Sequence, residues 1–214
     1  MSQTKKFYDR YWKDEHIKVN SFDRHPGEWT DQNFRFHFDF FKPYVHGNAL
    51  DFGCGQGQFA HKVRPWCVSV QGIDVCAAAI DRACASYPDV KFLLQGDDRL
   101  PYADCSFDTV FALDVFEHIL DLETVLDQLN RVLKKQGNLL IATSELTRLK
   151  TILIALTALD AYFYPAGPHV RHFTRHNLKD LLARKGFEAV AYCKNRTYFG
   201  FIPQGQLVVA TKVR

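Results

Sequence analysis

Short apolar runs alternate with amphipathic stretches from Asn48 to the end of the chain. Several of the runs are continuously apolar, which is typical of strands that are covered on both faces. Strands that alternate with helices favour βαβ units, so the pattern predicts an α/β fold with a mostly parallel sheet. The predicted strands are Ala49–Phe52, Val68–Ile73, Val90–Leu94, Thr109–Leu113, Asn138–Ala142, Phe187–Tyr192 and Leu207–Thr211.

Two of the amphipathic stretches have recognisable helix ends. Asp121 can cap a helix over residues 122–133, and Gly137 follows where that helix would stop. Thr174 can cap a second helix, for which Gly186 supplies the C-terminal stop. We therefore expect a helix on each of these segments, with its apolar stripe against the sheet.

Two segments lie outside this alternation. Residues 1–46 are charged and aromatic, and we expect short helices and loops that cap a main domain over residues 47–214. Residues 144–173 form an insertion whose central part, from Thr151 onward, is apolar nearly all round. Such a helix is either buried or pressed against a partner.

Composition narrows the class of protein. With 214 residues and 47% hydrophobic content, the chain suits one well-packed domain and not a disordered one. A formal net charge of +3 is too small to argue for nucleic acid, and the basic cluster at residues 169–176 is short. The six cysteines lack CxxC spacing, and no signal-peptide pattern or membrane-length apolar run occurs. We expect reduced thiols, no metal site and a cytoplasmic location, and the oligomeric state stays open.

The strongest chemical signal is a glycine-rich turn after the first predicted strand, with Gly53, Gly55 and Gly57 in the segment DFGCGQG. Glycines here let the backbone turn tightly and approach a ligand without a Cβ in the way. The G-x-G-x-G spacing departs from the dinucleotide fingerprint, because Gln58 stands where a small residue is needed. A turn without any ligand is the alternative interpretation.

Acidic residues follow the next strands at the same predicted sheet edge. Asp74 ends the second strand, where a carboxylate can accept both hydroxyls of a ribose; the alternative is a helix cap. Asp97 follows the third strand and could accept from an adenine amine. The fourth strand leads into Asp114 and the Glu117–His118 pair. Three such strand ends in order predict a nucleoside site.

The segments LDFGCGQGQFA, GID, QGDDRLPYADCSFDTVFALDVFEHI and LNRVLKKQGNLLIAT resemble class I methyltransferases that use S-adenosylmethionine (SAM). The branch that includes quinone-biosynthesis enzymes is the most similar. The likeness covers residues 48–143 closely and is looser through HVRHFTRHNLKDLLARKGF to the last strand. It implies a Rossmann-like sheet of seven strands with helices on both faces and an antiparallel last strand.

The resemblance also implies roles for individual residues. The glycine loop would approach the amino-acid and ribose parts of SAM, and Asp74 would bind the ribose. The residues that it assigns to SAM or its product S-adenosylhomocysteine (SAH) are Arg35, Asp51, Gly53, Gly55, Gly57, Asp74, Val75, Asp97 and Leu113. A guanidinium suits a carboxylate, although Arg35 could equally be a surface residue of an amphipathic helix.

A general base is needed only if the methyl acceptor must lose a proton near the transition state. The candidates are His118, after the fourth strand, and His169 and His172, in the segment that covers the substrate in related enzymes. Solvated loop histidines are the alternative, and Asp114 and Glu117 are weaker candidates. The insertion would form a lid or wall of the acceptor pocket, which favours a small hydrophobic or aromatic acceptor.

Other functions remain open. Gln58 argues against a nicotinamide-dependent oxidoreductase, and the intact glycine loop argues against a SAM-binding protein without turnover. Methylation of nucleic-acid bases typically uses an Asn/Asp-Pro-Pro-Tyr motif, which residues 114–117 replace, so no nucleic-acid partner is expected. Contact of the apolar insertion with a membrane surface is a further alternative.

Overall fold

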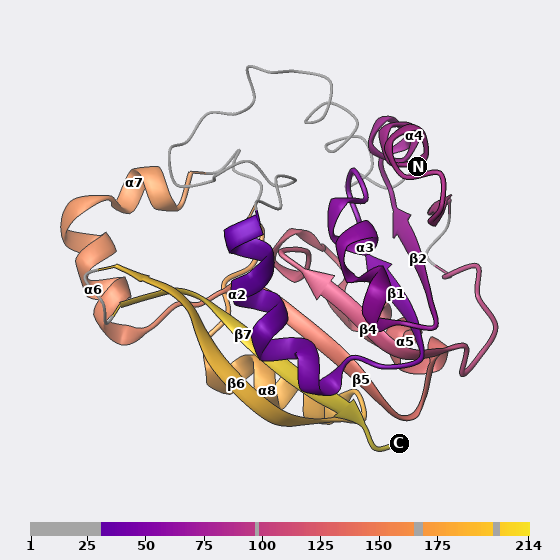
Figure 1. The fold of residues 1–214 in the computed structure, drawn as a ribbon. Helices are drawn as coiled ribbons and strands as arrows, with labels where there is room; N and C mark the ends of the chain where they lie inside the picture. The colour runs from indigo at the N-terminus through magenta and orange to yellow at the C-terminus, as the bar shows by residue number, and fades with distance from the viewer. Residues whose placement is uncertain (1–30, 97–98, 165–168, 199–201) are drawn as a thin grey trace.

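A computed structural model describes residues 31–96, 99–164, 169–198 and 202–214 (Figure 1). The centre is one seven-stranded sheet in the order β3-β2-β1-β4-β5-β7-β6. Neighbours are parallel from β3 to β5, and β7 is antiparallel to both β5 and β6. The strands are β1 (Asn48–Phe52), β2 (Ser69–Asp74), β3 (Lys91–Leu94), β4 (Phe107–Leu113), β5 (Leu133–Ser144), β6 (Phe187–Tyr198) and β7 (Ile202–Lys212). The predicted fold class, including the antiparallel last strand, is confirmed.

Helices cover both faces of this sheet (Figure 1). One face packs against α5 (Leu122–Val132) and α8 (Arg175–Arg184). The other packs against α2 (Asp31–Phe41), α3 (Gln58–Val63) and α4 (Ala77–Ser86). Consecutive residues of β4 alternate between the two cores, so Val110–Leu113 are all apolar.

The predicted helix caps form. The Asp121 side chain accepts from the Thr124 amide, and Thr174 forms a reciprocal capping box with Asn177 at the start of α8. Gly186 follows α8 with a φ of +82°, a conformation that favours glycine.

The predicted helix over residues 122–133 is one residue too long, and its stop signal was misread. α5 ends at Val132, and Leu133 already pairs with Phe107 as the first residue of β5. Gly137 lies inside β5, where an added Cβ would come within 3.0 Å of the Asp108 carbonyl oxygen. This glycine therefore permits a close approach of β5 to β4, and it does not end a helix.

The segments at the edges of the sheet depart from the prediction in length. β6 and β7 continue past the apolar runs through polar residues such as Lys194, Asn195 and Gln206, because these pair within the hairpin. The insertion between β5 and α8 contains α6 (Arg148–Thr157) and α7 (Leu159–Tyr162). Among the described residues, the helices are too short or too polar to cross a bilayer. Residues 1–30 of the expected N-terminal cap lie outside the described part.

Candidate active site

The order of the strands places the glycine-rich turn at a special point of the sheet. β1 lies between β2 and β4, so the connections that leave β1 and β4 diverge at the carboxyl edge of the sheet. Ligands of open α/β sheets bind in the crevice at this point. The turn after β1 and the short 3-10 helix η4 (Phe116–His118) after β4 both lie at this edge.

The backbone of the turn requires its glycines. Gly53, Gly55 and Gly57 have φ values of +75°, +52° and +79°, in the region that side chains with a Cβ rarely adopt. The amides of Gly53 and Cys54 both donate to the Ile73 carbonyl oxygen, at 2.8 and 3.1 Å. The turn is therefore tied to β2.

Gly57→Ala is expected to destabilise the protein by about 1–3 kcal/mol, because the added Cβ would lie 2.4 Å from the Phe92 ring in a left-handed backbone. Chemical denaturation measures this loss. Gly96→Ala is the matched control, since its Cβ would meet nothing within 4 Å. Equal stability of the two variants would contradict the packing argument.

Asp74 connects the second strand to the glycine-rich turn. Its Oδ2 accepts from the Gly55 amide at 2.9 Å, and its Oδ1 accepts from the Cys76 amide at 2.8 Å. A carboxylate oxygen can accept more than one hydrogen bond, so each keeps room for a hydroxyl donor. Burial raises the pKa of this carboxyl, whereas the amide hydrogen bonds lower it.

Asp51 is the second carboxylate of the site and lies within β1, directly before the turn. Its side chain is 3% exposed, and its buried Oδ2 has no hydrogen-bond partner among the described residues. Burial and repulsion from Asp74 raise its pKa to about 7, against a smaller lowering by the Ala60 amide. A buried carboxylate with unused accepting capacity is suited to a cationic group of a ligand.

The other residues that the resemblance assigns to the cofactor differ in burial and in their distance from the glycine-rich turn along the chain. Leu113 is buried at the end of β4, and Val75 is half-buried between Asp74 and α4. Arg35 is exposed on α2, close to Asp31, while its neighbour Phe34 packs on Phe59 after the turn. Asp97 lies outside the described residues.

The three candidate histidines come together at the edge beyond β4. The His118 and His169 ring centroids lie 4.8 Å apart, and the His169 and His172 centroids lie 6.5 Å apart. A ligand atom of Glu117 joins those of His118 and His169, with all three within 4.8 Å of one another. The sequence places His169 and His172 in one segment and His118 in another, so the contact between His118 and His169 is a finding of the structure.

Glu117, which follows β4, forms hydrogen bonds with both ends of the insertion. Its carboxylate accepts from the Thr143 hydroxyl at 2.9 Å and the Ser144 amide at 3.2 Å, where β5 ends. Its carbonyl oxygen accepts from the amides of Val170 and Arg171, where the insertion returns. The side chain is 2% exposed, and burial, with repulsion from Asp114, raises its pKa to about 7. The sequence made Glu117 only a weaker candidate for the general base. Its contacts join segments that are distant in the sequence, so spacing alone does not reveal them.

His172 contacts two aromatic side chains of the insertion, at the end of α7. Its ring stacks on Tyr162 at 5.3 Å and meets Phe163 edge-on at 5.1 Å. Its Nδ1 is buried without a hydrogen-bond partner among the described residues. Burial, followed by the charges of His169 and Lys150, lowers the pKa of His172.

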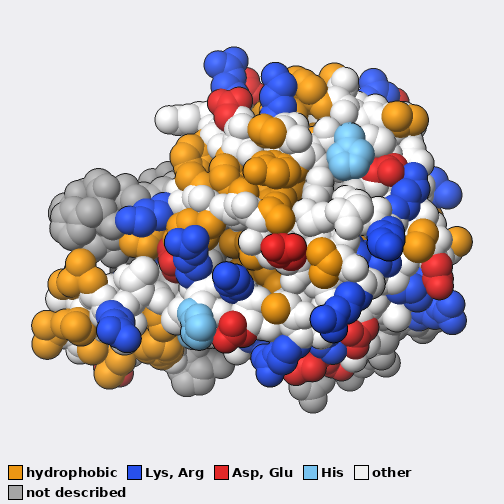
Figure 2. All heavy atoms as spheres, turned by 90° about the horizontal axis from the view of Figure 1, so that it is seen from below, with side chains coloured by type: hydrophobic (Ala, Val, Ile, Leu, Met, Phe, Trp, Pro, Cys, Tyr) orange, Lys and Arg blue, Asp and Glu red, His pale blue; other side chains and the backbone are white. Residues whose placement is uncertain are grey.

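A buried lysine connects the start of the insertion to neighbouring backbone. Lys150 is buried on α6 and donates to the carbonyl oxygens of Glu145 and Gln204, both at 2.9 Å. Most apolar side chains of α6 and α7 are exposed, including Leu156 at 77%. Figure 2 shows hydrophobic side chains gathered at the end of the molecule where α6 lies in Figure 1. The apolar pattern therefore marks an exposed surface, and Ile154 is the one large apolar side chain of α6 that is buried.

A comparison with known families decides which kind of protein carries this site. A family model described as a methyltransferase domain matches residues 10–192. The chain belongs to the methyltransferase domain family.

Relatives of this methyltransferase-domain chain agree with the assignment. It is 32% identical over 160 residues to the human mitochondrial ubiquinone biosynthesis O-methyltransferase, a match that covers 68% of this chain and 42% of the relative. The chain spans about half the length of the curated relatives that it matches. The resemblance to SAM-dependent methyltransferases is confirmed.

Solved structures show the same fold. A SAM-dependent methyltransferase from Methanosarcina mazei aligns with a TM-score of 0.66 at 20% identity, over 81% of this chain and 96% of that chain. The [4+2]-cyclase SpnF aligns with a TM-score of 0.74 at 18% identity, over 99% and 95%. Both likenesses concern the fold alone.

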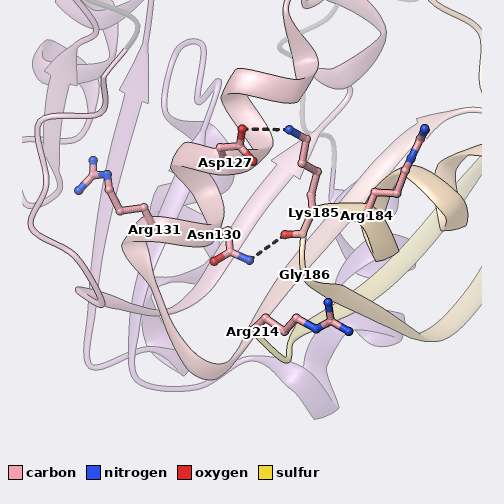
Figure 3. A pocket seen from close by; sticks show the side chains of 7 residues that line it. All are labelled: Asp127, Asn130, Arg131, Arg184, Lys185, Gly186 and Arg214. Atoms are coloured by element: carbon pink, nitrogen blue, oxygen red, sulfur yellow. Dashed lines mark hydrogen bonds and ion pairs between the residues drawn. The ribbon is translucent and has the colours of Figure 1, made fainter.

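A surface pocket of about 380 Å³ lies at the opposite edge of the sheet from the methyltransferase-type site (Figure 3). Asn130 and Arg131 precede β5, and Lys185 and Gly186 precede β6, so these residues lie at the amino ends of β5 and β6. Lys185 is held by Asp127 at 2.9 Å. This pocket is separate from the carboxyl edge, where the sequence motifs converge.

Proposed function

We propose that the protein is a SAM-dependent methyltransferase that transfers a methyl group to an oxygen of a small hydrophobic or aromatic acceptor. The observation that carries the proposal is the direct link between the glycine-rich turn and Asp74, through the Gly55 amide. It joins a glycine-rich backbone turn to a carboxylate suited to ribose hydroxyls. The family assignment supports methyl transfer, and the relative named as an O-methyltransferase supports oxygen rather than nitrogen.

The acceptor class follows from the side chains around His172. Tyr162 and Phe163 offer aromatic faces next to the histidine cluster, and the apolar α6 continues the same segment. Aromatic side chains recognise flat apolar molecules by stacking and by edge-to-face contact. We place the acceptor between this wall and the end of β4.

The chemistry asks little of the protein beyond alignment. SAM carries an activated methyl group on a sulfonium, so the acceptor oxygen must be held in line with the methyl–sulfur bond. His172 is the proton acceptor in this proposal, because its buried Nδ1 has unused accepting capacity. Asp51 would meet the positive charge of the cofactor's amino-acid part.

Binding separates this proposal from an oxidoreductase. Calorimetry with SAH and with NAD(H) is expected to show binding of SAH alone. Binding of NAD(H) without SAH would overturn the proposal. Binding of SAH without transfer of labelled methyl groups from SAM to any component of a cell extract would favour a SAM-binding protein without turnover.

His172→Gln is expected to lower the rate of methyl transfer by about 100-fold or more, because a positioned base typically contributes that much. SAH affinity should stay unchanged. His176→Gln is the control, since this histidine is exposed on α8 and pairs with Asp180. An unchanged turnover number in His172→Gln would remove the proposed base.

A further inference from the structure

Two buried oxygen atoms lie without hydrogen-bond partners on the strands that flank β7. They are Ser144 Oγ, on the last residue of β5, and Asn195 Oδ1, on β6. Neither oxygen has a partner among the residues that the structure describes. Buried polar atoms in folded proteins are almost always hydrogen-bonded, so each of these oxygens needs a ligand group or a bound water molecule as its partner.

Both side chains extend from the same face of the sheet, on either side of a glycine. Gly205 of β7 pairs with Ser144 on one side and with Asn195 on the other. Residues that lie opposite each other in antiparallel strands extend their side chains to the same face. Gly205 contributes no side chain between its two neighbours, which leaves space for a group of a ligand.

This face of the sheet is the one that α2 covers. Leu207, two residues after Gly205, packs in the same core as Phe38 of α2, and Figure 1 shows α2 beside β7. His37 of α2 is 4% exposed, and its Nε2 lies 3.1 Å from Nδ2 of Asn195. The contact holds the Asn195 amide in one orientation, so its Oδ1 is pre-organised to accept a hydrogen bond.

A row of apolar residues connects this place to the end of β4 on the same face. Leu113 pairs with Ala142 of β5, which in turn pairs with Leu207 of β7. All three side chains are buried in the core beneath α2. The two oxygens and Gly205 form the next row toward the carboxyl edge. They therefore lie on the same face as Leu113, the residue that the resemblance assigns to the cofactor.

The strand order sets the distance between the two places. Neighbouring strands lie about 4.8 Å apart, so Gly205, two strands away from β4, lies about 10 Å from the end of β4. The end of β4 is where we place the reacting part of the acceptor. An aromatic molecule of two rings covers this distance.

The chemistry of the two oxygens selects the group that fits between them. Asn195 Oδ1 can only accept a hydrogen bond, whereas the Ser144 hydroxyl can donate or accept. A neutral hydroxyl group satisfies both, because it can donate to Asn195 while it accepts from Ser144. A carboxylate has no proton to donate, so it would leave Asn195 Oδ1 without a partner and would repel it.

From this arrangement we infer that Ser144, Gly205 and Asn195 form a polar subsite that binds a hydroxyl group of the methyl acceptor, about 10 Å from the methylated oxygen. The inference rests on the proposed function and narrows the acceptor to molecules with a second hydroxyl group. Ser144 and Asn195 then determine specificity, because they bind the acceptor away from the reacting atoms.

The test compares two probes that differ by one hydroxyl group. In p,p′-biphenol the two hydroxyl oxygens are separated by a distance similar to that between the end of β4 and Gly205, and p-phenylphenol lacks one of them. Equilibrium dialysis of each probe against the full chain, with and without saturating SAH, gives the dissociation constants. We expect the unaltered protein to bind p,p′-biphenol about 10-fold or more tightly than p-phenylphenol.

Variants of the two side chains identify the source of this preference. Ser144→Ala should lower the preference, and the double variant Ser144→Ala/Asn195→Leu should bind both probes equally, with no loss of affinity for p-phenylphenol. Lys194→Met is the matched control, because this exposed neighbour of Asn195 extends to the opposite face and should leave the preference unchanged. Circular dichroism checks that every variant folds, and Ser144→Ala alone tests the subsite if the double variant does not.

The outcomes separate the subsite from the proposed function. Equal affinity of the unaltered protein for the two probes, or no binding of either, would overturn the subsite and leave buried water as the partner of the two oxygens. A preference that persists in the variants would also overturn it. Calorimetry with SAH reports the cofactor site independently. Absence of SAH binding together with a preference for p,p′-biphenol would overturn the proposed function and retain the subsite.

Discussion

Asp74→Ala is expected to weaken SAH binding by about 100-fold or more. Hydrogen bonds to a charged group contribute about 1.5–3 kcal/mol each, and a ribose offers two hydroxyls to this carboxylate. The substitution also leaves the amides of Gly55 and Cys76 without their acceptor. Calorimetry of SAH binding to the purified variant measures the loss.

Two further variants separate ribose recognition from damage to the turn. Asp81→Ala removes an exposed carboxylate from α4 and should leave SAH affinity unchanged. Asp74→Asn keeps one side-chain oxygen for an amide of the turn but loses the charge, so its affinity should fall between those of Asp74→Ala and the unaltered protein. Near-normal affinity of Asp74→Ala would show that the ribose lies elsewhere.

Apolar runs and capping residues carried enough information to predict the sheet and its main helices. The central strands β1 and β4 are buried on both faces, so apolar residues occupy consecutive positions, such as Val110–Leu113, and are easily recognised. Asp121 and Thr174 cap helices through contacts within a few residues, which sequence spacing captures directly. Gly137 was misread because a glycine that ends a helix and a glycine that permits close strand packing look the same in one sequence.

The candidate site could be predicted only where its contacts are local or follow strand order. The turn at Gly53–Gly57 and Asp74 occupy consecutive strand ends, which parallel topology brings together. The contact between His118 and His169 depends on how the insertion folds back, and Glu117 fixes that path through its own carbonyl oxygen. The sequence also did not decide whether α6 is exposed, because a helix that is apolar nearly all round can be either buried or exposed for contact with a partner.

Asp51→Asn is expected to stabilise the ligand-free protein at pH 8 by about 2 kcal/mol, even though it removes a charge assigned to cofactor binding. The folded-state pKa of Asp51 is raised from 3.8 to about 7, chiefly by burial. Each unit of that rise corresponds to about 1.4 kcal/mol against the ionised form. The buried amide that replaces the carboxylate offsets part of the gain.

The direction of the pH dependence follows from proton binding. Between pH 3.8 and about 7, the folded protein holds a proton on Asp51 that the unfolded chain has released. The contribution of Asp51 to stability is therefore fully present below pH 3.8, falls as the pH rises and is lost above about 7. The gain from Asp51→Asn should grow from pH 5 to pH 8, where it corresponds to a rise in Tm of about 4–8 °C.

Asp108→Asn provides a control of opposite sign. Desolvation is the largest single influence on the pKa of the Asp108 carboxyl and raises it, but the hydrogen bonds from the Lys134 ammonium and the Asn48 amide, with nearby positive charge, together outweigh it and lower the pKa. This substitution should destabilise the protein at pH 8, because a depressed pKa stabilises the fold above the unfolded value. A stability gain in Asp51→Asn that is independent of pH would contradict the charge argument.

The ligand should reverse the effect of Asp51→Asn. A cationic group of SAH next to the Asp51 carboxylate would favour its ionised form and offset the burial of its charge. SAH should therefore raise the Tm of the unaltered protein more than that of Asp51→Asn, with the largest difference at pH 8. An equal rise in both proteins would mean that Asp51 does not meet the charged part of the cofactor, and that its raised pKa has no part in binding.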